Sequence, residues 1–203
     1  TIGTMDLNDA SGTGVTSNFN ASAATGDVTL GSASADFKDS NSEEFTVTFG
    51  SGTNAAYAGT AALDEDNFVG TTGTDTLYLS EAASGTLATT VTSIDNVEVQ
   101  LSTTASDAQT ISLANFTDVG KVTLVAASSD APNEGITVSN IGSSQAIHLK
   151  TDTSKDFEAD VITLTNATGV TGLGVTLEGA VALHSGGVAI TTDAGTVSVT
   201  DTI

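Results

Sequence analysis

The chain has 203 residues, of which 25 are Asp or Glu and only 4 are Lys, so its formal net charge is -21 at pH 7. It contains no Arg, Cys or Trp, and so acidic a surface repels nucleic-acid phosphate and anionic lipid, which excludes both as expected partners. Apolar residues still make up 38% of the chain, which favours a folded domain over disorder, and the absence of Cys excludes a disulfide-held fold.

The first ninety residues are irregular, with short apolar runs separated by Gly, Ser and Asn. Alternation of apolar and polar residues predicts strands here at Asp27–Leu30, Glu43–Phe49 and Thr76–Leu79. Most of the Phe residues also fall in this part of the chain, which indicates a larger core. We therefore expect an irregular β-rich segment over residues 1–66 and a repetitive β domain over residues 67–203, with the boundary near Asp64 to Gly73.

From Ile94 onward, apolar residues alternate with small polar residues at a period of two, which predicts strands with one buried face. Clusters of Gly, Asn, Asp and Ser separate these runs and supply turns. The intervals between runs alternate between longer and shorter, which indicates two strands per coil of about 25 residues, as in stacked solenoid repeats. The apolar pairs are Val97 and Val99, Ile111 and Leu113, Val122 and Leu124, Ile136 and Val138, Ile147 and Leu149, Ile162 and Leu164, Val175 and Leu177, Val188 and Ile190, and Val197 and Val199.

Two all-β architectures with little or no helix fit this pattern. We favour a β-solenoid of short strands, similar to a parallel β-helix, because aromatic residues make up only 4% of the chain and a sandwich core needs bulky side chains. The alternative is an antiparallel β-sandwich, in which the same intervals would be hairpins and Greek-key connections. The last interval, across Asp193 to Gly195, is short enough for a tight hairpin and locally favours the sandwich.

The strongest local motif is Gly70-Thr71-Thr72-Gly73-Thr74-Asp75-Thr76-Leu77. It resembles one degenerate copy of the Gly-Gly-x-Gly-x-Asp calcium turn of repeats-in-toxin proteins, with a Thr in place of the second Gly. In such turns the glycines let backbone carbonyls point at the ion while the Asp carboxylate supplies charge. The upstream carboxylates complete the predicted calcium-binding set, which is Asp64, Asp66, Gly70, Gly73 and Asp75. An ordinary acidic loop is the alternative interpretation.

Side chains suited to catalysis are scarce, and we expect no enzymatic activity. The sequence has no phosphate-binding loop and no metal-type spacing of Cys or His. His148 falls on the polar phase of the predicted strand Ala146–Lys150, so we expect it at the surface. His184 precedes a Ser-Gly-Gly turn that does not match the Gly-x-Ser-x-Gly nucleophile pattern.

Four stretches together resemble bacterial surface-layer (S-layer) proteins of the repeats-in-toxin secreted type, namely Asn67–Leu77, Val91–Val99, Thr110–Phe116 and Val119–Leu124. The resemblance implies a non-catalytic, calcium-stabilised β-rich subunit at an extracellular cell surface. It also implies assembly of identical subunits into a lattice or filament. The alternative is a ligand- or surface-binding module of a large secreted adhesin, with cell-surface polysaccharide as one partner.

The chain begins at Thr1 and stops at Ile203 in a strand-like pattern, and it has no apolar run of membrane-spanning length. We therefore expect a fragment of a longer polypeptide, or a processed product, that is not inserted into a membrane.

Overall fold

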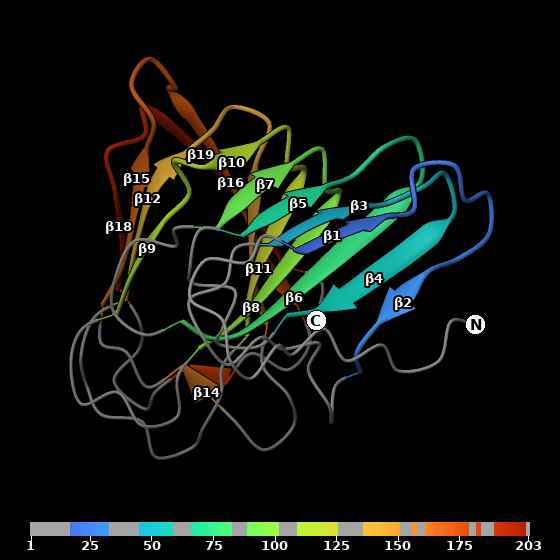
Figure 1. Ribbon diagram of the computed structural model, residues 1–203. Helices are drawn as coiled ribbons and strands as arrows, with labels where there is room; N and C mark the ends of the chain where they lie inside the picture. The colour runs from blue at the N-terminus through green and yellow to red at the C-terminus, as the bar shows by residue number, and fades with distance from the viewer. Residues whose placement is uncertain are drawn as a thin grey trace. The chain divides into compact units, whose positions relative to one another are not determined.

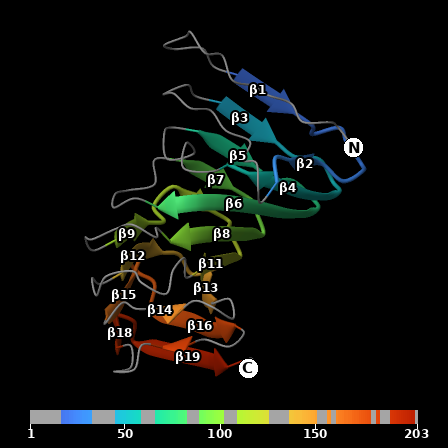
Figure 2. The same ribbon diagram turned by 90° about the horizontal axis from the view of Figure 1, so that it is seen from below.

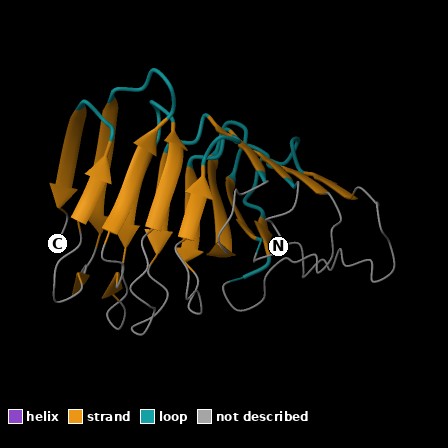
Figure 3. Ribbon diagram, turned by 90° about the vertical axis from the view of Figure 1, so that its left-hand side faces the viewer, coloured by secondary structure: helices purple, strands orange, loops and turns teal. Residues whose placement is uncertain are grey.

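The computed structural model describes residues 17–32, 45–58, 66–82, 89–101, 109–125, 136–150, 156–157, 161–178, 182–183 and 189–201 (Figure 1). These residues form strands and turns and no helix (Figure 3). Neighbouring strands pair in parallel wherever their register is known, and strands of one sheet alternate along the chain with strands of another. The predicted all-β solenoid is therefore confirmed, and the antiparallel sandwich is wrong.

The described strands fall into four sheets. The first contains β1 (Ser17–Asn20), β3 (Phe45–Thr48), β5 (Asn67–Val69), β7 (Thr90–Thr92) and β10 (Phe116–Thr117), in that order. The eight-stranded sheet contains β2 (Thr29–Leu30), β4 (Thr53–Tyr57), β6 (Thr74–Ala82), β8 (Asn96–Leu101), β11 (Lys121–Val125), β13 (Ala146–Lys150), β16 (Gly172–Glu178) and β19 (Thr196–Asp201). The third contains β9 (Gln109–Ser112), β12 (Ile136–Ile141), β15 (Val161–Asn166) and β18 (Ala189–Thr192), and the smallest pairs β14 (Asp156–Phe157) with β17 (Ala182–Leu183).

The chain divides into two compact units. Unit 1 comprises Thr1–Ser80, Ala88–Glu98 and Asn115–Gly120, and unit 2 comprises Glu81–Leu87, Val99–Ala114 and Lys121–Ile203. Unit 1 therefore holds the five-stranded sheet together with β2, β4 and most of β6, whereas unit 2 holds the four-stranded sheet together with β11, β13, β16 and β19. Strand β8 contributes residues to both units.

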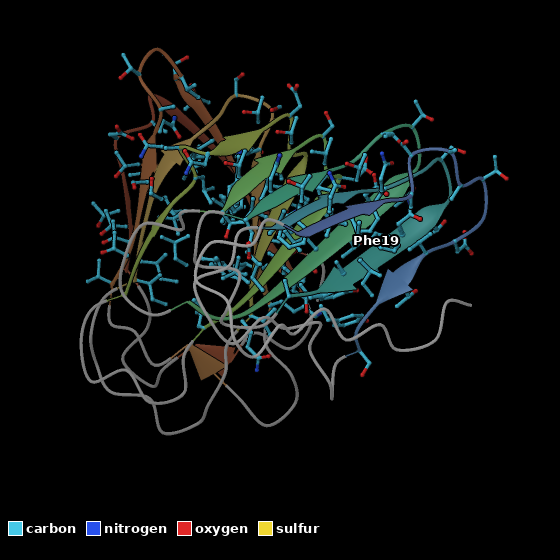
Figure 4. All side chains as sticks on the ribbon, viewed as in Figure 1. Phe19 is labelled. Carbon is cyan, nitrogen blue, oxygen red and sulfur yellow. The ribbon has the colours of Figure 1, made fainter. Side chains whose placement is uncertain are left out.

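A row of apolar side chains explains why the strands of the five-stranded sheet stack in unit 1. Phe19, Val47, Phe68, Val91 and Phe116 occupy equivalent positions on successive strands. The last four are at most 6% exposed, whereas Phe19, on the terminal strand β1, is only half-buried (Figure 4). Figure 2 shows β1, β3, β5 and β7 side by side in this order. Side chains in a strand alternate between faces, so a sequence of period two points its apolar residues to one face. Each coil thereby adds one apolar residue to this row.

In unit 2 the core rows consist mainly of branched aliphatic residues. Val122, Ile147 and Val175 are in register on β11, β13 and β16, and all three are at most 1% exposed. They lie 25 and then 28 residues apart in sequence, so each coil has about the predicted length. The narrow interior of a solenoid accepts these side chains without aromatic residues.

The predicted hairpin across Asp193 to Gly195 is wrong. Strand β18 pairs with β15, and β19 pairs with β16, so these residues connect two different sheets. A corner of a solenoid needs as few residues as a hairpin turn, and the interval alone does not distinguish the two.

The domain boundary expected between residues 66 and 67 stays a prediction. Within unit 1, β4 pairs in parallel with β6 from opposite sides of that boundary. Among the described residues, none forms a helix long and apolar enough to span a membrane.

Candidate functional site: the corner column

Asp and Asn side chains recur in unit 1 where the chain enters each successive strand of the eight-stranded sheet. Asp27 precedes β2, Asn54 and Asp75 are second residues of β4 and β6, and Asp95 precedes β8. Hydrogen bonds connect each of the four to a neighbouring coil. We call these four residues the corner column.

Asn54 is the centre of the corner column and is only 1% exposed. Its Oδ1 accepts a hydrogen bond from the Val28 backbone N–H at 3.0 Å in the preceding coil. Its Nδ2 donates to the carbonyls of Gly50 and Gly52 at 3.0 and 3.1 Å, and to Asp75 Oδ1 in the following coil at 2.7 Å. One amide side chain thus closes its own turn and connects three coils.

Asp75 is fully buried, and both of its carboxylate oxygens accept hydrogen bonds. Oδ1 accepts from Asn54 Nδ2, and Oδ2 accepts from the Thr71 backbone N–H at 3.1 Å. Burial raises the pKa of Asp75 above its ordinary value of 3.8, the two hydrogen bonds act in the opposite direction, and the nearby Asp95 carboxylate raises the pKa further. Asp75 is therefore a structural hydrogen-bond acceptor, and its burial makes the ionised carboxylate less favourable than it would be in water.

The two ends of the corner column are exposed to solvent. Asp27 Oδ1 accepts from the Thr53 backbone N–H at 2.9 Å, and Asp95 Oδ2 accepts from the Asp75 backbone N–H at 2.8 Å. Asp118, in the corresponding turn before β11, is also exposed. Carboxylates therefore recur at the surface of this corner.

The glycines of the predicted calcium motif allow neighbouring turns to approach closely. A Cβ added to Gly70 would lie 2.0 Å from the Ser93 carbonyl oxygen and 2.5 Å from Asp75 Oδ2. A Cβ added to Gly73 would lie 2.0 Å from the Gly52 carbonyl oxygen. Neither glycine has a positive φ, so the absence of a side chain, rather than a left-handed backbone, is what these positions require.

The structure brings only part of the predicted calcium set together. Gly70, Gly73 and Asp75 meet in one corner turn, as the motif suggested. Asp66 is fully buried, and it lies at the end of β5 opposite to Gly70. The extended chain from Asp66 to Gly70 is about 13 Å long, so Asp66 is distant from the corner turn. Asp64 lies outside the described residues. In the described part of the chain, no group of three or more His, Cys, Asp or Glu is arranged to hold a metal ion.

A buried Asn side chain in unit 2 uses similar chemistry. Asn166 is 9% exposed at the end of β15, and its Nδ2 donates to the carbonyls of Val170 and Gly172, each at 3.2 Å. Its backbone N–H donates to Asp193 Oδ1 in the following coil at 2.9 Å. Asx side chains therefore close turns and connect coils in both units.

A charged cluster lies on the outer face of unit 2. His148 Nδ1 is 2.5 Å from Glu178 Oε1, and Lys121 Nζ is 3.8 Å from the same oxygen. The His148 side chain is 16% exposed, so it lies on the outer face as predicted but is more covered than expected. His184 lies outside the described residues.

Sequence reasoning missed the most connected member of the site, Asn54. The available signal was positional, because an Asp or Asn lies one or two residues before the first buried apolar residue at the start of each strand that unit 1 contributes to the eight-stranded sheet. This holds for Asp27 before Val28, Asn54 before Ala56, Asp75 before Leu77 and Asp95 before Val97.

No family model, curated protein or solved structure matches this chain.

Proposed function

We propose that this chain is a non-catalytic structural subunit that assembles with copies of itself into an extracellular, cell-surface lattice or filament, and that calcium stabilises the assembly. The observation that carries the proposal is the recurrence of exposed carboxylates, Asp27, Asp95 and Asp118, at one corner of a repetitive parallel solenoid. Repetition provides a regular surface, and carboxylates are hard ligands suited to calcium.

The net charge makes a counterion physically necessary for assembly. Subunits of charge -21 repel one another unless ions screen or bridge them. Monovalent salt only screens, whereas calcium is also coordinated by carboxylate oxygens. The proposal therefore requires an effect of calcium beyond that of ionic strength.

Electron microscopy of the purified chain with calcium, and with a chelator at equal ionic strength, tests the proposal. We expect ordered sheets or fibres with calcium and their loss on chelation. Monodisperse particles in both conditions would refute it. The variant Asp118→Asn removes one corner carboxylate and should raise the calcium concentration needed for assembly, whereas Glu98→Gln, with the same charge change on β8, should leave it unchanged.

A row of threonines in unit 2 favours a second candidate, a surface-binding adhesin module. Thr110, Thr137, Thr163 and Thr191 are in register on β9, β12, β15 and β18. Adjacent strands are about 4.8 Å apart, so the row presents hydroxyl and methyl groups at a regular spacing. Co-sedimentation with insoluble polysaccharide tests this candidate. Loss of binding in the double variant Thr137→Val and Thr163→Val would support it, and no binding by the wild type would reject it.

A further inference from the structure

In unit 2, the described side chains on the outer face of the four-stranded sheet carry no charge. Strands β9, β12, β15 and β18 lie side by side in this sheet (Figure 2). Their buried core positions alternate with outward positions that are exposed or half-buried, namely Thr110, Thr137, Ser139, Val161, Thr163, Thr165 and Thr191. We call this set the threonine face.

The outer face of the eight-stranded sheet in unit 2 is charged instead. Lys121, His148 and Glu178 form the cluster on β11, β13 and β16 described above. The exposed Asp193 lies in the corner turn after β18, where its Oδ1 accepts the Asn166 N–H. On a chain with a net charge of -21, the threonine face therefore offers a second copy a contact with little charge repulsion.

The threonine face also presents apolar groups in rows. Thr110, Thr137, Thr163 and Thr191 are in register, and Val161 on β15 is 38% exposed. Adjacent strands are about 4.8 Å apart, so the methyl groups repeat at that spacing. A second copy has the same spacing, so its rows can pack between these rows, as the facing sheets of a β-sandwich do about 10 Å apart.

The small area of the threonine face favours a repeated contact over an isolated dimer. Its four strands span about 15 to 20 Å, and the outward residues span about 7 to 14 Å along each strand, so the face covers at most roughly 300 Å². A stable interface buries about 800 Å² on each partner.

We infer that the threonine face packs against the threonine face of a second copy in a two-fold contact, which is weak alone and is reinforced by the other contacts of the assembly. In such a contact the same residues meet from both sides. This inference rests on the proposed function, because it names one contact of the assembling subunit.

Crosslinking through an introduced cysteine tests whether the two faces meet. The chain has no Cys, and facing sheets lie about 10 Å apart, which is too far for a disulfide but within reach of a bis-maleimide of similar length. We expect Thr163→Cys to give a crosslinked dimer at high protein concentration with calcium. Thr176→Cys, a half-buried threonine on the charged outer face of unit 2, should give none. Equal crosslinking of the two variants, or none at Thr163, would overturn the inference.

Charge variants test the two-fold arrangement. Sedimentation in calcium should show that Thr163→Asp weakens association at least roughly tenfold, because the contact brings two new carboxylates together. Mixing this variant with Thr163→Lys should restore association, whereas the same substitutions at Thr176 should leave association unchanged. A mixture that stays dissociated would contradict a contact between identical faces.

The double variant Thr137→Val and Thr163→Val separates this contact from polysaccharide binding. Valine keeps the branched shape and adds a methyl group, so self-association should persist, whereas a polysaccharide held by the hydroxyls should be released. Loss of self-association in this variant would overturn the inference. Crosslinked dimers without calcium-dependent sheets would reject the proposed function alone, and sheets without the Thr163 crosslink would reject this inference alone.

Discussion

At the scale of single residues, Asn54 shows how one polar side chain can hold several coils together. Its amide makes four hydrogen bonds in a place where it is 1% exposed. Buried polar groups that lose a partner cannot turn to water instead, so removing the amide takes a partner from the Val28 N–H and from Asp75 Oδ1, whereas the Gly52 carbonyl keeps the Thr74 N–H.

We expect Asn54→Ala to lower the free energy of unfolding by roughly 3 kcal/mol, since it leaves the Val28 N–H and Asp75 Oδ1 without this partner. Urea unfolding measures the change. The control Asn18→Ala, an exposed residue of β1, should change stability by less than about 0.5 kcal/mol. Equal losses in the two variants would show that Asn54 is not a structural hub.

The raised pKa of Asp75 predicts a component of stability that grows on acidification. Because its pKa is higher in the folded than in the unfolded state, the folded protein binds the proton more tightly. Stability from this group is therefore fully present below the ordinary value of 3.8 and is lost as pH rises through the folded pKa.

Asp75→Asn removes this titration together with one acceptor. We expect the unfolding free energy of the wild type minus that of the variant to increase as pH falls from 7 toward the ordinary value of 3.8. Denaturant unfolding over a pH series measures this difference, in which titrations common to both proteins cancel. A constant difference, or one that decreases on acidification, contradicts the assignment.

At the scale of elements, the corner turns are spaced by backbone contact between successive coils. We expect Gly73→Ala to destabilise the protein by about 3 kcal/mol, because its Cβ would lie 2.0 Å from the Gly52 carbonyl oxygen. Thermal and urea unfolding measure the loss. Gly26→Ala is the matched control, since its Cβ would have nothing within 4 Å. Similar stability of the two variants would contradict the close stacking of the turns.

Much of the element pattern was predictable from the sequence. Period-two alternation predicted strands such as β8, β11 and β13, and low aromatic content correctly favoured the solenoid. Strand β4, Thr53–Tyr57, was missed because its buried side chains are Asn54 and Ala56 rather than branched apolar residues. Asn54 was missed because Val28 and Asp75, its partners in neighbouring coils, lie 26 and 21 residues away. Only the register between coils brings them together.

At the scale of the whole molecule, we propose that this acidic solenoid is a structural subunit stabilised by calcium. Acidic composition alone can also reflect general adaptation to salt. Specific calcium binding and general salt adaptation differ in one respect. A specifically bound ion stabilises the folded state by mass action, whereas screening is the same in calcium and sodium solutions of equal ionic strength.

The most direct test is the melting temperature of the wild-type chain against calcium concentration at constant ionic strength. Binding at one hundred times the dissociation constant contributes about 2.7 kcal/mol, which corresponds to a rise of roughly 5 to 10 °C for a chain of this size. We predict a melting temperature that rises steadily with calcium. Superimposable melting curves in calcium and sodium would contradict specific calcium binding to the folded chain.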